Sequence, residues 1–249
     1  MQKKFLIFQL RPETEAADDE FAAILRKGRL DPDHVRRIRL DQEALPDDLT
    51  LDEYAGIIVG GGPGCVSDPA SEKKPVEARI EADMLSLMPE VTERDFPFLG
   101  CCYGIGILGK HLEARVSKEA FSEPVGTASC SLTEAAQDDL LLKDVPADFD
   151  AFVGHKEALQ ELPDRCVHLV SSSTCPYQMV RYGRNVYATQ FHPEADAEVF
   201  ETRINTYKTY GYFSPEDAGT LIAGCHAADV FAPEKILRNF VLRYAAGRG

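Results

Sequence analysis

The sequence predicts an α/β fold in which a doubly wound, flavodoxin-like parallel sheet is followed by a helical C-terminal tail. Short apolar runs alternate with segments whose apolar residues recur at helical spacing, which is the pattern of strands joined by helical crossovers. Turns containing glycine follow several of the apolar runs. The 249 residues, 44% of them hydrophobic, suit one large domain or one domain with an appendage.

The first half of the chain alternates strands with helices. The predicted strands cover residues 4–10, 36–40, 56–59 and 96–99. Phe21, Ile24 and Leu25 mark one face of the first helix. The second helix carries an apolar stripe at helical spacing, formed by Val76, Ile80, Met84, Leu87, Met88 and Val91. A further helix is predicted over residues 105–112, and strand ends at one edge of such a sheet are where sites form.

The second half predicts more strands and then helices. Strands are expected over residues 149–153, 167–171, 178–182 and 186–190, with strands or hairpins at the border of the sheet over residues 114–132. The tail, residues 197–249, is helical in pattern, with helices beginning at Pro215 and Pro233. We therefore divide the chain into an α/β domain, residues 1–196, and a helical extension packed on it, residues 197–249. For Tyr207, Tyr210 and Tyr212 core packing is favoured over a place at the mouth of a site.

The segment 96–106 predicts a sharp turn from a buried strand into a helix. Gly100 and Gly104 lie two residues to either side of Cys102, so the backbone can turn there without a Cβ clash and Cys102 forms the tip. A thiol at a helix N-terminus is favoured as thiolate, the form that attacks carbon. Cys101 is the competing candidate, but it lacks the symmetric glycines and is expected to point into the sheet.

A second motif, His192-Pro-Glu194, follows directly after a predicted strand. His192 is a candidate general base for a cysteine nucleophile, and Glu194 would hold the imidazole in the required tautomer. Either motif alone is common, and a cysteine flanked by glycines is more often structural than catalytic. Their order along the chain and their places at strand ends predict a catalytic triad of Cys102, His192 and Glu194.

Composition excludes several classes of function. A net charge of −14 argues against a nucleic-acid or membrane surface, which requires clustered Lys and Arg. The N-terminus lacks the apolar region and cleavage site of a signal peptide, and no run has the length of a membrane span. The seven cysteines are odd in number and form no C-x-x-C pair, so neither a disulfide framework nor a zinc site is predicted. We expect a cytoplasmic enzyme with no metal and no cofactor.

Two further segments have two interpretations each. The cluster 60–64 is not a nucleotide loop, because no Lys-Ser or Lys-Thr follows and G-x-G-x-x-G is absent. It is either a structural tight turn or part of a site. The segment 152–157 places His155, Lys156 and Glu157 straight after aromatic residues. His155 is equally well explained as a satisfied loop histidine.

Taken together, these motifs resemble the class I, triad-type glutamine amidotransferases, and among them the stand-alone GMP-synthase-like group. That family carries Gly-x-Cys-x-Gly at the elbow and His-Pro-Glu about a hundred residues downstream. With the glycine cluster and the segment 152–157, the resemblance spans about three quarters of the chain. It implies the catalytic residues Cys102, His192 and Glu194, an oxyanion hole from the backbone amides of Gly62 and Tyr103, and substrate binding by Gly64, His155, Lys156 and Glu157.

The resemblance implies that Cys102 forms a thioester with a glutamine side chain and releases ammonia, which passes to a separate synthase or acceptor-binding subunit. The family usually has a glutamine four residues after the nucleophile, where this chain has Gly106. That departure favours an alternative enzyme, a γ-glutamyl hydrolase or peptidase with the same triad. A non-catalytic binding module is the least favoured reading. The expected ligand is glutamine or another γ-glutamyl small molecule.

Overall fold

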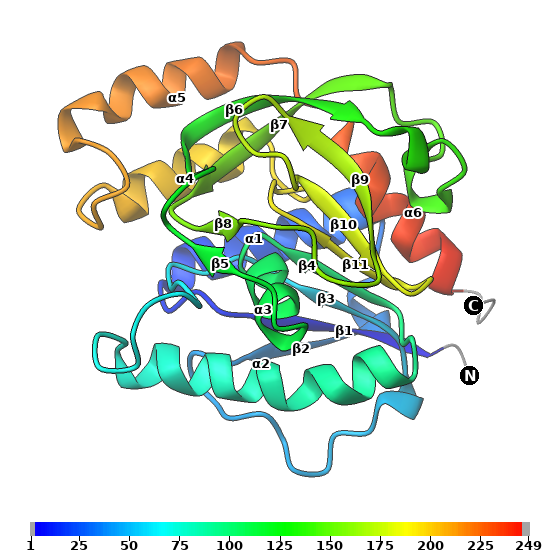
Figure 1. Cartoon of the computed structure of the whole chain (residues 1–249). Coiled ribbons are helices and arrows are strands. Elements are labelled where there is room, and N and C mark those ends of the chain that lie inside the picture. Colours follow the sequence, from blue (N-terminus) through cyan, green and yellow to red (C-terminus); the bar gives the residue numbers. More distant parts are fainter. Residues whose placement is uncertain (1–2, 246–249) are drawn as a thin grey trace.

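A mixed sheet of nine strands runs through the part of the chain that the computed structural model describes, residues 3–245. The strands are β1 (Lys4–Gln9), β2 (Val35–Arg39), β3 (Tyr54–Val59), β4 (Phe98–Cys101), β6 (Glu123–Leu132), β7 (Asp148–His155), β9 (Cys166–Ser172), β10 (Met179–Tyr182) and β11 (Val186–Thr189). Their order across the sheet is β2-β1-β3-β4-β11-β10-β9-β6-β7 (Figure 1). The short strands β5 (Val116–Ser117) and β8 (Ala158–Leu159) pair separately.

Five neighbouring strands form the parallel, doubly wound half of the sheet. β2, β1, β3, β4 and β11 pair in parallel. The chain passes from β1 outward to β2 and then back to β3, so the strand order reverses between β1 and β3. Ligand sites of open α/β sheets form at such a switch point, beyond the carboxyl ends of the strands. The predicted α/β, flavodoxin-like fold is confirmed.

The other half of the sheet is antiparallel. β10 pairs with β11 and β9, and β6 pairs with β9 and β7, all antiparallel. The expected pairing of residues 167–171 with 178–182 is present, and so is the turn from β10 into β11. The segment 114–132, whose arrangement the sequence left as strands or hairpins, supplies β6 to the main sheet and β5 to the small one.

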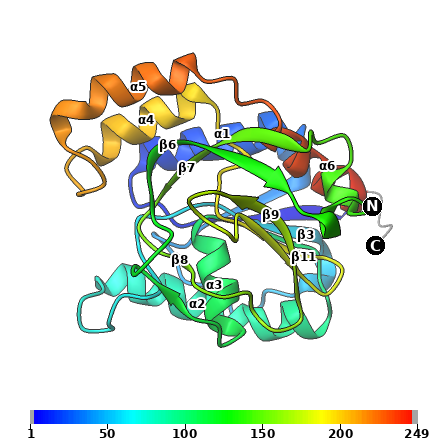
Figure 2. The ribbon, with the colours of Figure 1, turned by 45° about the horizontal axis from the view of Figure 1, so that its top comes forward.

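Helices lie on both faces of the sheet. They are α1 (Thr14–Gly28), α2 (Pro75–Glu93), α3 (Tyr103–His111), α4 (Ala197–Tyr207), α5 (Ala218–Ala227) and α6 (Pro233–Ala245). α1 and α6 pack on one face, where Ile24 and Phe240 join a core with Phe5 and Ile7 of β1. α2 and α3 pack on the other face (Figures 1 and 2). Alternate residues of each parallel strand therefore point into two separate cores, as expected of strands buried on both faces.

The tail lies against the rest of the protein. α4 contacts α1 and α5, and α6 contacts α1 (Figure 2). Pro233 begins α6 as expected, whereas Pro215 begins only a 3₁₀ turn, Pro215–Asp217, that leads into α5. The last four residues of the predicted tail, 246–249, lie outside the described part, as do residues 1–2 of the predicted α/β domain. The division at residue 196 stays a prediction.

Within residues 3–245, no helix combines the length and the apolar character that crossing a membrane requires.

Candidate active site

Cys102 lies at the tip of the predicted elbow, between β4 and α3. Its backbone has φ 54° and ψ −87°, in the positive-φ region that residues other than glycine rarely adopt and that costs roughly 1–3 kcal/mol. The Cys102 N–H donates to the carbonyl of Thr189 in β11 at 2.7 Å, which ties the strained turn to the neighbouring strand. Cys101 is only 1% exposed and belongs to the core, as predicted.

The two glycines of the elbow have different roles. An added Cβ at Gly100 would lie 2.8 Å from a Phe98 ring carbon and 2.9 Å from the Cα of Gly104, closer than real Cβ contacts. An added Cβ at Gly104 would meet nothing nearer than Val59, at 3.9 Å. The expectation that both glycines avoid a Cβ clash is therefore correct for Gly100 and wrong for Gly104. The strand also runs to Cys101 and the helix begins at Tyr103, because the turn is tighter than the apolar pattern indicates.

His192 and Glu194 follow β11 and are both buried. The His192 Nδ1 lies 2.8 Å from Glu194 Oε1, so this nitrogen donates its proton to the carboxylate and Nε2 is left to accept one. The backbone N–H of His192 donates to the carbonyl of Phe152 in β7 at 3.0 Å, which ties the backbone at His192 to that strand. His192 and Cys102 line the same cavity. The structure thus brings together the three residues predicted as a triad.

A buried network of charges extends the His192–Glu194 pair. Arg203 Nη2 donates to Glu194 Oε1 at 2.7 Å and to Glu20 Oε2 at 3.2 Å, and Arg11 Nε donates to the same Glu20 oxygen at 2.8 Å. The exposed fraction of each of these four side chains is below one tenth. Two guanidinium groups thus face two carboxylates beside the triad, and this network was not anticipated from the sequence.

The sequence does contain signals for the network. Glu20 occupies a position on the apolar face of α1, and Arg203 occupies one on the apolar face of α4. A charged residue on such a face needs a buried partner, because an unpaired charge is costly inside a protein. Arg11 stands two residues beyond the end of β1, where sites of parallel sheets form. None of the three signals identifies its partner.

The electrostatics of the site differ from the thiolate expected at a helix N-terminus. Burial raises the pKa of the Cys102 thiol to about 12, and the nearby Arg11 and Arg203 offset this only in part. Burial also lowers the pKa of His192, against the opposing effect of Glu194. The pKa of Glu194 is lowered despite its burial, because His192 and Arg203 both interact with its charged form. The free site therefore holds a neutral thiol, a neutral imidazole and an ionised carboxylate at neutral pH.

This charge state predicts a pH profile. Because the pKa of His192 is lowered below its ordinary value of about 6.5, the neutral base persists as the pH falls through 6.5 and is lost only in more acidic solution. We expect kcat/KM for the reaction of this site to keep its plateau down to pH 6.5 and to show no rise near the ordinary thiol pKa of about 8.5. A rise in kcat/KM centred between pH 8 and 9 would show that a pre-formed thiolate is the active form.

The residues predicted to bind substrate line a second cavity beside Cys102. Gly62, Gly64, Tyr103 and the segment 154–157 contribute to its walls. The Glu157 carboxylate accepts the backbone N–H groups of Val66 and Ser67, each at 2.9 Å. An added Cβ at Gly106 would lie 3.1 Å from Glu157 Oε1 and 3.2 Å from Val66 Cγ2. Position 106 therefore offers no empty space, because Glu157 and Val66 fill it.

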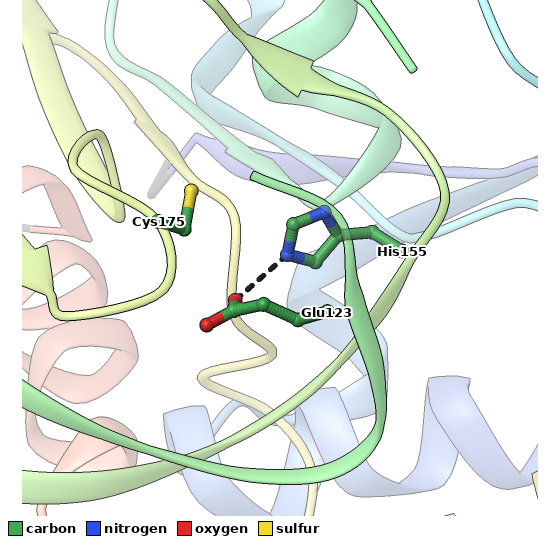
Figure 3. Close-up of side chains that lie close together, drawn as sticks. All are labelled: Glu123, His155 and Cys175. Carbon is green, nitrogen blue, oxygen red and sulfur yellow. Dashed lines mark hydrogen bonds and ion pairs between the residues drawn. The ribbon is translucent and has the colours of Figure 1, made fainter. Parts of the chain in front are cut away.

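His155 supports the Glu157 segment rather than facing the substrate cavity with its nitrogens. Its Nδ1 donates to the carbonyl of Glu157 at 2.8 Å, and its Nε2 lies 2.8 Å from Glu123 Oε2 (Figure 3). The interpretation of His155 as a satisfied histidine is thus correct for its side chain. Lys156 has another partner: its Nζ donates to the carbonyl of Tyr210 at 3.0 Å and lies 4.1 Å from the centre of the Tyr212 ring.

Cys175 joins Glu123 and His155 in a buried group whose potential metal-ligand atoms all lie within 4.8 Å of one another (Figure 3). The sequence gives no spacing that indicates this group. Glu123 also accepts hydrogen bonds from the side chains of Thr174 and Gln178, and burial raises the pKa of the Cys175 thiol to about 12. A carboxylate with these partners and a neutral thiol suit a hydrogen-bonded support for β6 and β7 better than a metal site.

The tail contributes a wall of the site. Tyr207, Tyr212 and Phe213 line the cavity that contains His192 and Cys102, and the Tyr212 hydroxyl donates to the carbonyl of Pro63 at 3.1 Å. The preference for core packing of the tail tyrosines is therefore wrong for Tyr212. Tyr207 is buried and also borders the cavity. Tyr210 is exposed and its hydroxyl donates to Glu13.

Curated relatives match part of this chain. GMP synthase (glutamine-hydrolyzing) of Lactobacillus delbrueckii subsp. bulgaricus is 33% identical over 169 residues, 64% of this chain and 30% of the relative. The enzyme of the same name from Petrotoga mobilis is 26% identical over 149 residues, 59% of this chain and 26% of the relative. The match covers less than a third of the length of these relatives.

Solved structures match nearly the whole fold. A glutamine amidotransferase from Thermotoga maritima has a TM-score of 0.77 at 20% identity. The match covers 98% of this chain and 99% of that one. A glutamine amidotransferase from Methylobacillus flagellatus has a TM-score of 0.71 at 17% identity, covering 99% of this chain and 96% of that one. The family model for class-I glutamine amidotransferases matches residues 23–208, which include the elbow, the predicted triad and most of the sheet. The chain therefore belongs to the class-I glutamine amidotransferase family.

Proposed function

We propose that this chain hydrolyses the side-chain amide of glutamine to glutamate and ammonia, with Cys102, His192 and Glu194 as catalytic residues. One observation carries the proposal: the thiol at the tip of a strained strand-to-helix turn shares a cavity with a histidine whose Nδ1 is held by a buried carboxylate. This is the arrangement that an activated nucleophile requires. Membership of the amidotransferase family supports the choice of glutamine.

The neutral thiol and neutral imidazole define the first step. His192 Nε2 takes the proton of the Cys102 thiol as Sγ attacks the amide carbon, and the backbone amides of Gly62 and Tyr103 donate to the oxygen of the tetrahedral intermediate. Glu194 stabilises the imidazolium that forms. His192 then gives its proton to the departing amine, the C–N bond breaks and a thioester remains. Water, deprotonated by His192, attacks the thioester and releases glutamate.

The cavity beside Tyr103 is the place we assign to the amino-acid end of the substrate. The backbone of Gly64 and of the segment 155–157 would approach the α-carboxylate and the α-ammonium group. Glu157 is the buried acidic side chain among the residues that line this cavity, and each of its oxygens accepts one backbone N–H, so further lone pairs remain for an ammonium group. The Lys156 ammonium group already contacts Tyr210 and Tyr212. Lys156 would therefore act on the substrate indirectly, by holding Tyr212 in the wall of the cavity.

A substitution at Gly106 tests this assignment. A glutamine there would push into Glu157 and Val66, since the position holds no empty space. We expect Gly106→Gln to raise KM for glutamine several-fold, because it displaces the Glu157 carboxylate from the amides of Val66 and Ser67, while kcat changes less. Steady-state kinetics on the purified variant measure both constants.

Gly106→Ala is the matched control for this prediction. A single methyl group requires a smaller shift of the same neighbours, so its effect on KM should be the smaller of the two. A lower KM in Gly106→Gln than in the unmodified enzyme would show that the longer side chain finds space and a partner, contrary to the packing around Glu157.

We further propose that the released ammonia passes to a separate synthase or acceptor-binding subunit. The relatives named GMP synthase are more than three times longer than the segment they share with this chain, so in them this segment works beside a further part of the protein, which supports a synthase partner for the ammonia. A cytoplasmic location is the matching proposal. It is supported by the seven unpaired cysteines, which suit a reducing compartment.

An assay of product release tests the proposed function. Purified protein is incubated with glutamine, and ammonia and glutamate are measured together with a Cys102→Ala control. Equal amounts of both products, absent from the control, are expected. Cleavage restricted to other γ-glutamyl amides would instead identify the chain as a γ-glutamyl hydrolase, the alternative that uses the same triad. Release that persists in Cys102→Ala would contradict both enzymes.

A further inference from the structure

Cys102 lies between two cavities that differ in which parts of the proposed machinery border them. Of the two, Tyr103 and Glu157 line only the cavity assigned to the amino-acid end of the substrate, and His192 lines only the cavity that also contains Arg11 and Arg203. A general acid must reach the nitrogen that leaves, so the amine departs on the side of His192. The cavity that His192 lines is therefore where the leaving group of the substrate lies, and we call it the leaving-group cavity.

The leaving-group cavity is larger than ammonia requires. Its volume is about 50 Å³, whereas a single water molecule, which is similar in size to ammonia, needs roughly 10–15 Å³ on this measure. Its walls include the apolar and aromatic side chains Val125, Phe200, Tyr207, Tyr212 and Phe213. An amine with an apolar or aromatic side chain fits such walls better than ammonia does.

Arg11 supplies this cavity with a fixed cation. The residue is only 5% exposed and its Nε is bound to the buried Glu20. The rest of the guanidinium reaches past Gly61 towards the triad: an added Cβ on Gly61 would lie 2.5 Å from Arg11 Nη2 and 2.8 Å from His192 Cε1. Only glycine at position 61 allows both groups to approach this closely. A guanidinium has five N–H donors and binds carboxylates through two of them at once.

Resting on the proposed function, we propose that this cavity is a leaving-group subsite for amines that carry both an apolar or aromatic side chain and a carboxylate, so that γ-glutamyl amino acids are substrates. The carboxylate pairs with Arg11, and the side chain packs against Tyr207 and Tyr212. The chemistry balances as for glutamine. The C–N bond breaks as the thioester forms, His192 protonates the departing amino acid, and water releases glutamate.

Two matched substrates test the subsite. γ-Glutamylphenylalanine and γ-glutamyl phenethylamide have the same aromatic ring, but only the first carries a carboxylate on the leaving amine. We expect kcat/KM of the unmodified enzyme to be at least about tenfold higher for γ-glutamylphenylalanine, as for a hydrogen bond to a charged group. In Arg11→Gln the ratio of kcat/KM for γ-glutamylphenylalanine to kcat/KM for γ-glutamyl phenethylamide should fall to about one. In Arg11→Lys, which keeps the charge but loses the paired N–H donors of the guanidinium, the ratio should be intermediate.

The ratio separates recognition from a loss of folding or of general activity, because both substrates share the acyl group and the ring. Arg115→Gln, at an exposed arginine whose guanidinium pairs with Glu119, is the control and should keep the ratio. Glutamine hydrolysis with a ratio near one in the unmodified enzyme, or an unchanged ratio in Arg11→Gln, overturns the subsite and leaves the proposed function standing. No cleavage of any of the three compounds overturns the proposed function and the subsite with it.

Discussion

Cys102→Ala is expected to remove glutamine hydrolysis, lowering kcat by at least about 10⁴-fold, because Cys102 is the thiol that shares a cavity with His192, whereas the thiol of Cys65 lines only the substrate cavity. The side chain lies at the tip of the elbow and lines both cavities. The loss should be one of chemistry and not of folding, since alanine only removes a sulfur atom from the edge of a cavity. Ammonia release and the thermal unfolding midpoint, measured on the same preparation, distinguish the two.

Cys101→Ala is the matched control, one residue away in the chain. Its thiol is buried in the core, and burial holds its pKa well above the usual value. We expect this variant to keep its turnover and to lose roughly 1 kcal/mol of stability, as a small truncation in a core does. Loss of turnover in Cys101→Ala with retention in Cys102→Ala would reverse the assignment of the nucleophile.

His192→Ala is expected to lower kcat by about 10⁴-fold or more, because the neutral thiol cannot lose its proton without the imidazole. Glu194→Gln should leave measurable turnover, about 10²- to 10⁴-fold below the unmodified enzyme, because the base remains while its tautomer and its imidazolium lose support. Single-turnover measurements of glutamate formation compare the two variants.

Arg203→Gln separates the role of Glu194 from that of its second partner. Arg203 donates to the same Glu194 oxygen as His192, and its charge contributes to lowering the pKa of His192. The acid limb of the pH profile should therefore move to higher pH in this variant.

Wild-type kcat in His192→Ala would contradict the triad, whatever the outcome for the Glu194 and Arg203 variants.

The local parts of the fold and site could be predicted because they depend on residues close together in the sequence. Gly100, Cys102 and the apolar runs around them define the elbow, and the strand before His192 places it at the same sheet edge. The parallel half of the sheet follows from the alternation of strands and helices. The separation of Cys101 from Cys102 could be predicted from the glycines to either side of Cys102, which place the turn there and leave Cys101 in the strand.

The remaining features depend on contacts between distant segments. Arg11 follows the end of β1, Glu20 lies in α1 and Arg203 lies in α4, and no local pattern says that they meet. The same is true of Glu157, which occupies the space next to Gly106 and holds the loop at Val66 and Ser67. The protonation of Cys102 could not be predicted either, because burial raises the pKa of the thiol more than Arg11 and Arg203 lower it, and burial is a property of the whole fold.

The most direct test of this account is to trap the acyl-enzyme. The protein is mixed with glutamine, quenched in acid during turnover and digested, and the peptides are examined by mass spectrometry for a γ-glutamyl group in thioester linkage. The account predicts this group on Cys102 in the unmodified enzyme and its accumulation in a variant with slowed hydrolysis such as Glu194→Gln. A γ-glutamyl group on another cysteine, or ammonia release with every cysteine unmodified throughout turnover, would contradict it.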